Sequence, residues 1–123
     1  MIMEKIKTIC MMHGVVQAMS QLERQLEERF SLTINEAMFL CCLGRDTLSA
    51  STISETTCLT PSHASKVLRS VEKKGYVVRS LGENDKRLMN FTLTKQGLQV
   101  LESLQHEPLK VPELLQPLMD QPH

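Results

Sequence analysis

Polar side chains with hydrogen-bonding capacity follow a proline near the middle of the chain. Thr60 and Pro61 together are typical of a helix start, because threonine accepts a backbone N–H and proline suits the first turn. The helix predicted from there to Lys74 places its apolar residues on one face and its polar and basic residues on the other. Hydroxyl, imidazole, ammonium and guanidinium groups on that outer face can bond phosphate oxygens and base edges. The candidate contact residues are Pro61, Ser62, His63, Ser65, Lys66 and Arg69.

A second group of charged residues lies in a predicted turn between two short strands, 76–79 and 88–93. It consists of Asp85, Lys86 and Arg87. An arginine at such a tip can enter a narrow, electronegative minor groove, and Asp85 can orient it through an ion pair. The alternative is an ordinary hairpin ion pair, worth at most about 1 kcal/mol.

The net charge of zero conceals an uneven distribution. Residues 61–97 hold 8 basic and 3 acidic residues, which gives +5, whereas 1–60 carry −2 and 98–123 carry −3. Phosphate binding requires local rather than overall positive charge. A solvated charged face is the alternative, but the charge gathers on the helix and hairpin that carry the candidate contacts.

Hydrophobic periodicity and capping signals divide the chain into helices and one hairpin. Apolar residues recur every three or four positions from Ile2 to Phe30, which predicts a long helix. A helix of this length often packs against a partner chain. Gly14, in its middle, permits a kink, a break or a close crossing with another helix. Thr33 and Glu36 form a predicted capping box. The other predicted elements are helices 34–43, 50–57 and 95–106, a connector over 46–49, and a short helix within 112–120 beginning at Pro112. The fold class is therefore mainly α with a small β-hairpin, a winged helix-turn-helix.

Composition excludes several classes of protein. The chain has 123 residues, so it fits one domain with appendages, and 3% aromatic residues argue against stacking platforms for single strands. It contains no P-loop, G-x-S-x-G or H-E-x-x-H motif, so we predict no enzyme, no cofactor and no metal site. No apolar run is long enough for a membrane span, and a signal peptide is not expected. Cys41 and Cys42 are expected in the core, and reduced thiols predict a cytoplasmic protein.

Two segments resemble the MarR family of winged-helix regulators. The first is the run from Ile53 to Arg79, and the second comprises Asp85-Lys86-Arg87, Phe91 and Leu93-Thr94-Lys95-Gln96-Gly97. The resemblance implies a homodimer held by its first and last helices, with recognition helices in successive major grooves of a pseudo-palindromic operator. It also implies a regulator, expected to be a repressor, that a small-molecule or oxidant effector releases. Some members sense peroxides through a cysteine in the first helix, which makes Cys10 a possible redox site.

The resemblance suggests three parts: 1–30 as a dimerisation helix, 31–97 as the DNA-binding domain, and 98–123 as a helix and Pro-rich tail that contribute to the dimer. Cys58 stands where the family often has glycine, so a strained backbone is not expected there. The competing hypothesis is a winged-helix protein–protein interaction module without DNA binding. Neutralising the basic face would leave such a module unaffected.

Overall fold

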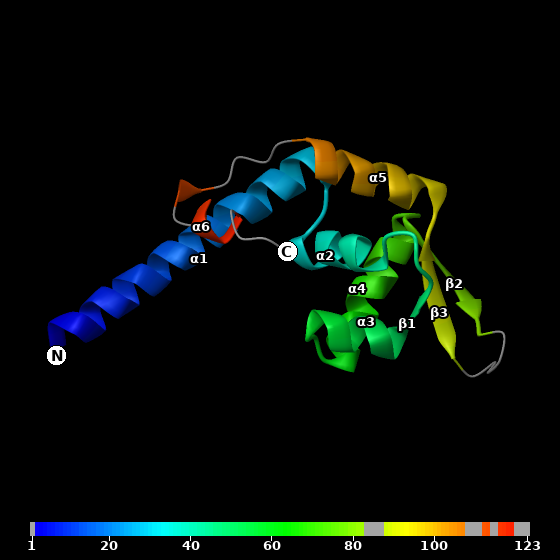
Figure 1. Ribbon diagram of the computed structural model, residues 1–123, viewed down its shortest axis with the longest axis horizontal. Helices are drawn as coiled ribbons and strands as arrows, with labels where there is room; N and C mark the ends of the chain where they lie inside the picture. The colour runs from blue at the N-terminus through cyan, green and yellow to red at the C-terminus, as the bar shows by residue number, and fades with distance from the viewer. Residues whose placement is uncertain (1, 83–87, 108–111, 114–115, 120–123) are drawn as a thin grey trace. The chain divides into compact units, whose positions relative to one another are not determined.

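The computed structural model describes residues 2–82, 88–107, 112–113 and 116–119. It consists of helices and one small sheet (Figure 1). The elements are α1 (Ile2–Phe30), α2 (Ile34–Leu43), β1 (Leu48–Ser49), α3 (Ala50–Thr57), α4 (Pro61–Lys73), β2 (Val77–Leu81), β3 (Met89–Leu93), α5 (Lys95–His106) and α6 (Gln116–Met119). Within the described ranges, no helix combines the length and the hydropathy that a membrane span needs.

The chain forms two compact units. One contains α1 and α6, and the other contains α2 to α5 with the sheet. Helix α1 continues through Gly14, so no break occurs there. The sequence predicts a short helix that begins at Pro112, whereas helix α6 begins at Gln116. Pro117 lies in the first turn of α6, where a proline is tolerated because the N–H it lacks would have no intrahelical partner.

The predicted helix starts are confirmed by their caps. The backbone N–H of Glu36 donates to Thr33 Oγ1 at 3.1 Å, and Thr33 N–H donates to Glu36 Oε1 at 2.9 Å, which completes the capping box. Ser49 caps α3. Thr60 Oγ1 accepts the N–H of His63 at 3.2 Å and so caps α4. These side chains satisfy N–H groups that a helix start leaves without intrahelical partners.

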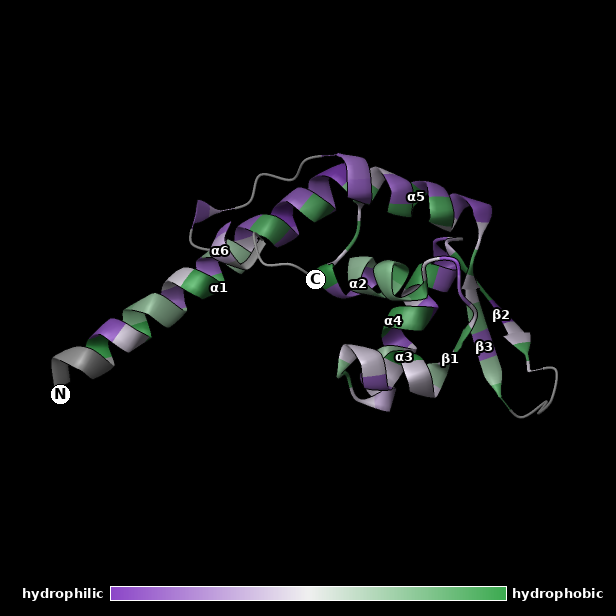
Figure 2. Ribbon diagram, in the orientation of Figure 1, coloured by the Kyte–Doolittle hydropathy of each residue, from purple (hydrophilic) through white to green (hydrophobic). Residues whose placement is uncertain are grey.

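The core of the second unit forms where α2 packs against α3, α4 and α5. Helix α2 is the most apolar of these helices, while α5 alternates between apolar and polar positions (Figure 2). Burial of apolar surface here holds α4 in place and leaves its other face free. The most buried side chains are Phe39, Leu40, Leu43, Ile53 and Val71.

The sheet has three antiparallel strands in the order β1-β3-β2. The predicted hairpin is present, with Val77 opposite Leu93. The predicted connector before α3 contains a third strand, in which Leu48 pairs with Phe91 and Ser49 with Asn90. A two-residue strand has no periodicity of its own, so only its distant partner β3 defines it.

The turn between α3 and α4 differs from the sequence-based expectation. Cys58 adopts a left-handed conformation with φ of 59° and ψ of 25°, and its N–H donates to Glu55 O at 3.4 Å. The expectation of an unstrained backbone was therefore wrong. The turn needs a left-handed residue to end α3, and here a residue with a Cβ fills the position at a cost of about 1 to 2 kcal/mol.

Replacing Cys58 by glycine is expected to stabilise the protein by about 0.5 to 1 kcal/mol. Glycine removes the left-handed penalty but loses more conformational entropy on folding, which offsets part of the gain. Urea unfolding measures the change. Cys58→Ala is the matched control, because alanine lacks the thiol but keeps the penalty. A glycine variant no more stable than the alanine variant would contradict the strain at this turn.

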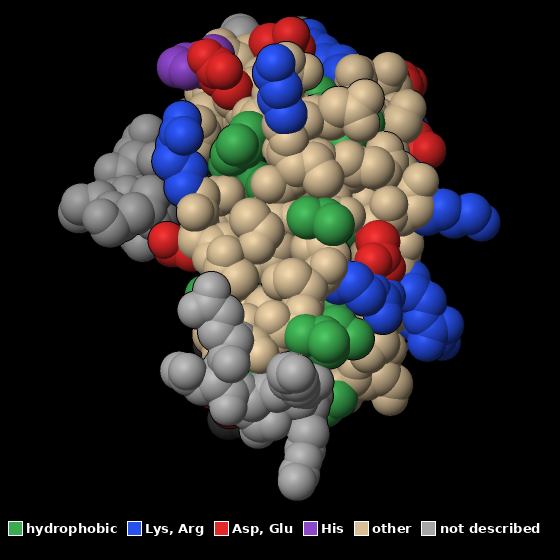
Figure 3. Space-filling model, turned by 90° about the vertical axis from the view of Figure 1, so that its right-hand side faces the viewer, with side chains coloured by type: hydrophobic (Ala, Val, Ile, Leu, Met, Phe, Trp, Pro, Cys, Tyr) green, Lys and Arg blue, Asp and Glu red, His purple; other side chains and the backbone are tan. Residues whose placement is uncertain are grey.

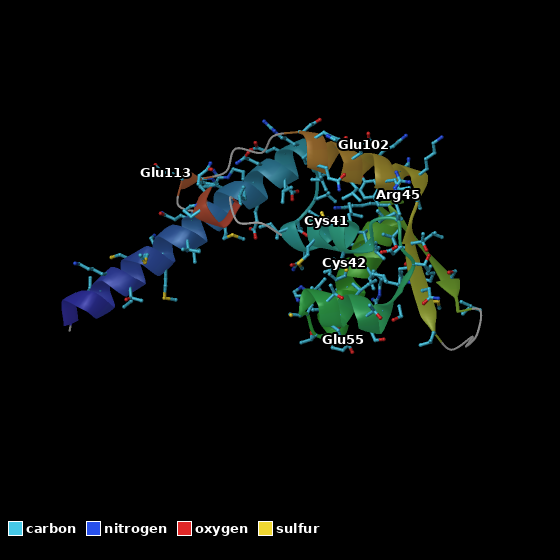
Figure 4. All side chains as sticks on the ribbon, viewed as in Figure 1. Cys41, Cys42, Arg45, Glu55, Glu102 and Glu113 are labelled. Atoms are coloured by element: carbon cyan, nitrogen blue, oxygen red, sulfur yellow. The ribbon has the colours of Figure 1, made fainter. Side chains whose placement is uncertain are left out.

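The two adjacent cysteines of α2 are not core residues. Cys41 is exposed and Cys42 is half-buried, so the prediction that both lie in the core was wrong (Figure 4). Partial burial still raises the pKa of both thiols. The inward face of α2 is occupied by Glu36, Phe39, Leu40 and Leu43 instead.

The junction between β3 and α5 is closely packed against the end of α4. Thr94 N–H donates to Tyr76 O at 2.9 Å, and Thr94 Oγ1 donates to Gly75 O at 2.6 Å while accepting the N–H of Gly97 at 3.0 Å. A Cβ on Gly97 would lie 2.1 Å from Tyr76 O. The Leu93–Gly97 segment therefore has a structural role: its threonine links two elements, and its glycine permits their approach.

Candidate nucleic-acid interface

Helix α4 separates its residues into two faces, as the sequence predicts. Ala64, Val67, Leu68 and Val71 are buried. The opposite face lies open to solvent over more than two turns. Its exposed residues are Pro61, Ser62, His63, Ser65, Lys66 and Arg69, which are the six contact residues predicted on this helix.

A buried carboxylate anchors α4 to α2. Glu36 is 3% exposed, and it accepts hydrogen bonds from Ser70 Oγ at 2.7 Å and Lys74 Nζ at 2.9 Å. Burial alone raises the pKa of Glu36, but the bonds from Lys74, Ser70 and Thr33 outweigh it, so this pKa lies below its ordinary value. The sequence indicated Glu36 only as part of a capping box. Its second role is to fix the position of α4 along and about its own axis relative to α2. This role depends on Ser70 and Lys74, which lie 34 and 38 positions further along the chain.

Not every basic residue of the 61–97 segment is available to a ligand. Lys74 pairs with Glu36, and Arg79 forms a two-point ion pair with Glu72 at 2.7 and 2.5 Å, which lowers the pKa of that carboxyl. Arg79 also lies 5.7 Å from the centre of the Phe91 ring. These two cations therefore contribute to the structure of the domain.

Other cations of this segment remain unpaired. Lys66, Arg69 and Lys73 are exposed, and none has a carboxylate partner within the described part of the chain. Lys and Arg side chains project from the side of the molecule that carries the hairpin, with acidic side chains between them (Figure 3). The local positive charge expected from the sequence is therefore carried by fewer residues than the count of 8 suggested.

A groove of about 480 Å³ lies beside the exposed face of α4. It runs between α3, the first half of α4 and the start of β3; its lining surface is mostly apolar, with serines among the lining residues. Glu55, labelled on α3 in Figure 4, is also one of the lining residues. Sequence reasoning missed this carboxylate, because only the packing of α3 on α4 brings it beside Ser65. The hydroxyl-bearing lining residues are Ser49, Ser51, Ser54 and Ser65.

The remaining predicted site residues lie elsewhere. Asp85, Lys86 and Arg87 fall outside the described residues. Cys10 is exposed on α1, in the other compact unit. The structure adds Asn35, which sequence reasoning did not identify: its Nδ2 lies 3.5 Å from Nε2 of His63. Among the described residues, no three His, Cys, Asp or Glu side chains gather to form a metal site.

Comparisons with known proteins agree with this architecture. Residues 32–89 match the family model described as the MarR family. A comparison with curated proteins found no match.

Solved structures show the same fold. A DNA complex of MepR from Staphylococcus aureus is 23% identical, with 94% of this chain and 84% of that chain covered and a TM-score of 0.75. AbsC from Streptomyces coelicolor, described as a MarR family transcriptional regulator, is 24% identical over 84% of this chain and 71% of that one, with a TM-score of 0.75. BldR from Sulfolobus solfataricus is 22% identical over 96% and 94%, with a TM-score of 0.69. The expected winged helix-turn-helix fold is confirmed.

Proposed function

We propose that this protein, whose residues 32–89 match the MarR family model, binds double-stranded DNA sequence-specifically as a homodimer and regulates transcription. Similarity to a MepR–DNA complex supports this function. The observation that carries the proposal is the exposed face of α4. It combines hydroxyl donors with the unpaired cations Lys66 and Arg69, while the opposite face is held in the core.

Helix α4 is the proposed recognition helix. Its N-terminal half carries Ser62, His63 and Ser65, whose side chains have the chemistry to contact base edges in the major groove. Lys66 and Arg69 neutralise phosphates or contact guanine. We extend the proposal to the turn beyond β2, where Lys86 would meet the backbone and Arg87, oriented by Asp85, would enter the minor groove.

The proposed dimer uses α1. Several large apolar side chains on this helix are exposed in the single chain, and their spacing of three or four residues places them on one broad face. A second copy would bury this surface, with 98–123 as a further contributor. The residues are Ile6 (54% exposed), Ile9 (65%), Met12 (62%), Val16 (62%) and Met19 (37%).

The proposed regulation is repression that an effector relieves. A dimer bound at its operator blocks transcription, and binding of a small molecule or oxidation would favour a form with less affinity for DNA. Cys10 is the proposed site for an oxidant, since its thiol is exposed. A peroxide would convert the thiolate to a sulfenic acid and release hydroxide.

The test is binding of the purified protein to the intergenic duplex upstream of its own coding sequence, compared with a scrambled duplex over a range of salt concentrations. Specific binding that falls steeply with salt supports the proposal. Affinity for both duplexes at the non-specific level of about 10⁻⁴ to 10⁻⁶ M would favour the protein–protein interaction module instead.

Replacing Lys66 by alanine is expected to weaken binding to both duplexes and to reduce the slope of log K against log salt by about 1 for each subunit. The reason is that one phosphate contact per subunit, with its released counterion, is lost.

Arg87→Ala is expected to weaken the operator complex more than the scrambled one, because a minor-groove arginine reads local DNA shape. Arg45→Ala is the matched control: it removes an exposed cation at the end of α2. An equal loss in the control would contradict the assignment of this face.

A further inference from the structure

Two consecutive residues of α2 contact two places on α4. Glu36 bonds Ser70 in the second half of α4 and Lys74 at its C-cap, and Asn35 lies against His63 in the first turn. The contacted residues and the buried Val67 are spaced by four, three and four positions, so they form one stripe on α4. The α2 contact therefore reaches from the C-terminal end of α4 to its first turn.

His63 is constrained from two directions. Its backbone N–H donates to the cap Thr60 Oγ1 at 3.2 Å, which fixes the first turn of α4. Its ring Nε2 lies 3.5 Å from Asn35 Nδ2. The side chain remains exposed on the face proposed to contact DNA. An imidazole held by this contact would lose less conformational entropy on binding a ligand.

The Asn35 contact and the tautomer of His63 depend on each other. With the amide nitrogen of Asn35 facing it, Nε2 of His63 can only accept, whereas an Nε2–H would pair with the amide oxygen after a rotation of the Asn35 amide. In a neutral imidazole the other nitrogen then carries the hydrogen. Nδ1–H is a donor, and it suits guanine N7 or O6, thymine O4, adenine N7 or a phosphate oxygen, but not the amino group of cytosine.

We infer that Asn35 is a positioning residue for DNA recognition, which holds His63 in the Nδ1–H form so that its donor faces an acceptor on the DNA. This inference rests on the proposed function and assigns α2 a part in sequence readout. Asn35 acts through His63 and not by its own contact with DNA. Its loss must therefore change the tautomer of His63, and its effect on binding must vanish when His63 is absent.

The first test uses the free protein. Nitrogen-15 NMR of the imidazole at about pH 8, where an ordinary histidine is neutral, distinguishes the two tautomers. We expect the Nδ1–H form of His63 in the unmodified protein and a shift toward Nε2–H in Asn35→Ala. Equal spectra for the two proteins, or Nε2–H in the unmodified protein, would overturn the inference without reference to DNA.

The second test is a double-mutant cycle on the operator duplex. Asn35→Ala is expected to weaken operator binding about three- to tenfold, the worth of one oriented hydrogen bond. The same change in a His63→Ala background should have no further effect. Gln99→Ala, which removes an exposed amide from α5, is the matched control and should not alter affinity.

The outcomes separate the inference from the proposed function. An unmodified protein that binds no duplex specifically overturns both. An unmodified protein that binds, with Asn35→Ala unchanged, overturns only the inference. A loss that persists in the His63→Ala background shows that Asn35 contacts DNA itself and also overturns it. Urea unfolding of each variant identifies any loss of affinity that is caused by misfolding. The tautomer test does not require DNA, so it applies whether or not the affinity changes.

Discussion

Replacing Gly97 by alanine is expected to destabilise the protein by about 3 kcal/mol or more, the largest effect of any single methyl group we predict. The added Cβ would lie 2.1 Å from the carbonyl oxygen of Tyr76 and 3.0 Å from its carbon. Both are backbone atoms, so no side-chain rotation relieves the overlap. The helix α5 or the segment before β2 must move.

That movement would break several hydrogen bonds at once. Tyr76 O accepts the N–H of Thr94, whose hydroxyl also links Gly75 O to the start of α5. The end of the hairpin and the end of α4 meet at this point. We therefore expect Gly97→Ala to lower DNA affinity as well, in proportion to the population that unfolds or shifts.

Gly75→Ala is the matched comparison for Gly97→Ala. Gly75 has a φ of 83°, so alanine there is strained, but its Cβ would meet only the side-chain oxygen of Gln96 at 3.0 Å. A flexible side chain can withdraw, so the expected cost is about 1 to 2 kcal/mol. Urea unfolding of both variants provides the measurement. A Gly97 variant no less stable than the Gly75 variant would contradict the close approach of α5 to Tyr76.

Replacing Glu36 by alanine is expected to destabilise the protein by about 3 kcal/mol. The change removes the capping acceptor of Thr33 and leaves the hydroxyl of Ser70 and the ammonium of Lys74 without their shared acceptor. Glu36→Gln keeps the shape and one acceptor but loses the charge, and we expect it to cost about 1 to 2 kcal/mol. Thermal or urea unfolding at neutral pH distinguishes the two.

The contribution of Glu36 depends on pH in a predictable direction. Its pKa in the folded protein lies below the ordinary value of about 4.3, because the bonds from Lys74, Ser70 and Thr33 outweigh the effect of burial. A lowered folded-state pKa stabilises the protein fully above the unfolded-state pKa, and that stabilisation is lost as pH falls through the folded-state value.

The stability difference between the unmodified protein and Glu36→Gln should therefore be constant near neutrality and shrink in acid. Lys74→Met, which keeps the aliphatic stem, is the matched partner variant. In its background the Glu36→Gln change should cost less, which isolates the ion pair from the cap. A difference that stays constant from neutral pH down into the acid range would contradict the buried ionised carboxylate.

The sequence by itself determined the local elements and the two faces of α4. The caps at Thr33, Ser49, Thr60 and Thr94 are local, since each side chain bonds an N–H only three residues away. The apolar spacing of α4 is likewise a property of one helix, so its buried and exposed faces could be read directly. The family resemblance depended on such short-range patterns.

Only the tertiary structure decided features that join distant segments. Strand β1 exists because β3 pairs with it, and Ser70 and Lys74 meet Glu36 across more than 30 positions. The exposure of Cys41 follows from the rotation that buries Phe39 and Leu40 instead.

The contact of Asn35 with His63 spans 28 positions and leaves no mark on either local pattern. The left-handed turn at Cys58 ends α3 without the glycine that would have indicated it in the sequence. Helix caps and amphipathic periods arise from bonds and packing within a few residues, whereas these features arise from the positions of whole elements. That is the physical reason why the sequence predicted the two faces of α4 but not the contact of Asn35 with His63.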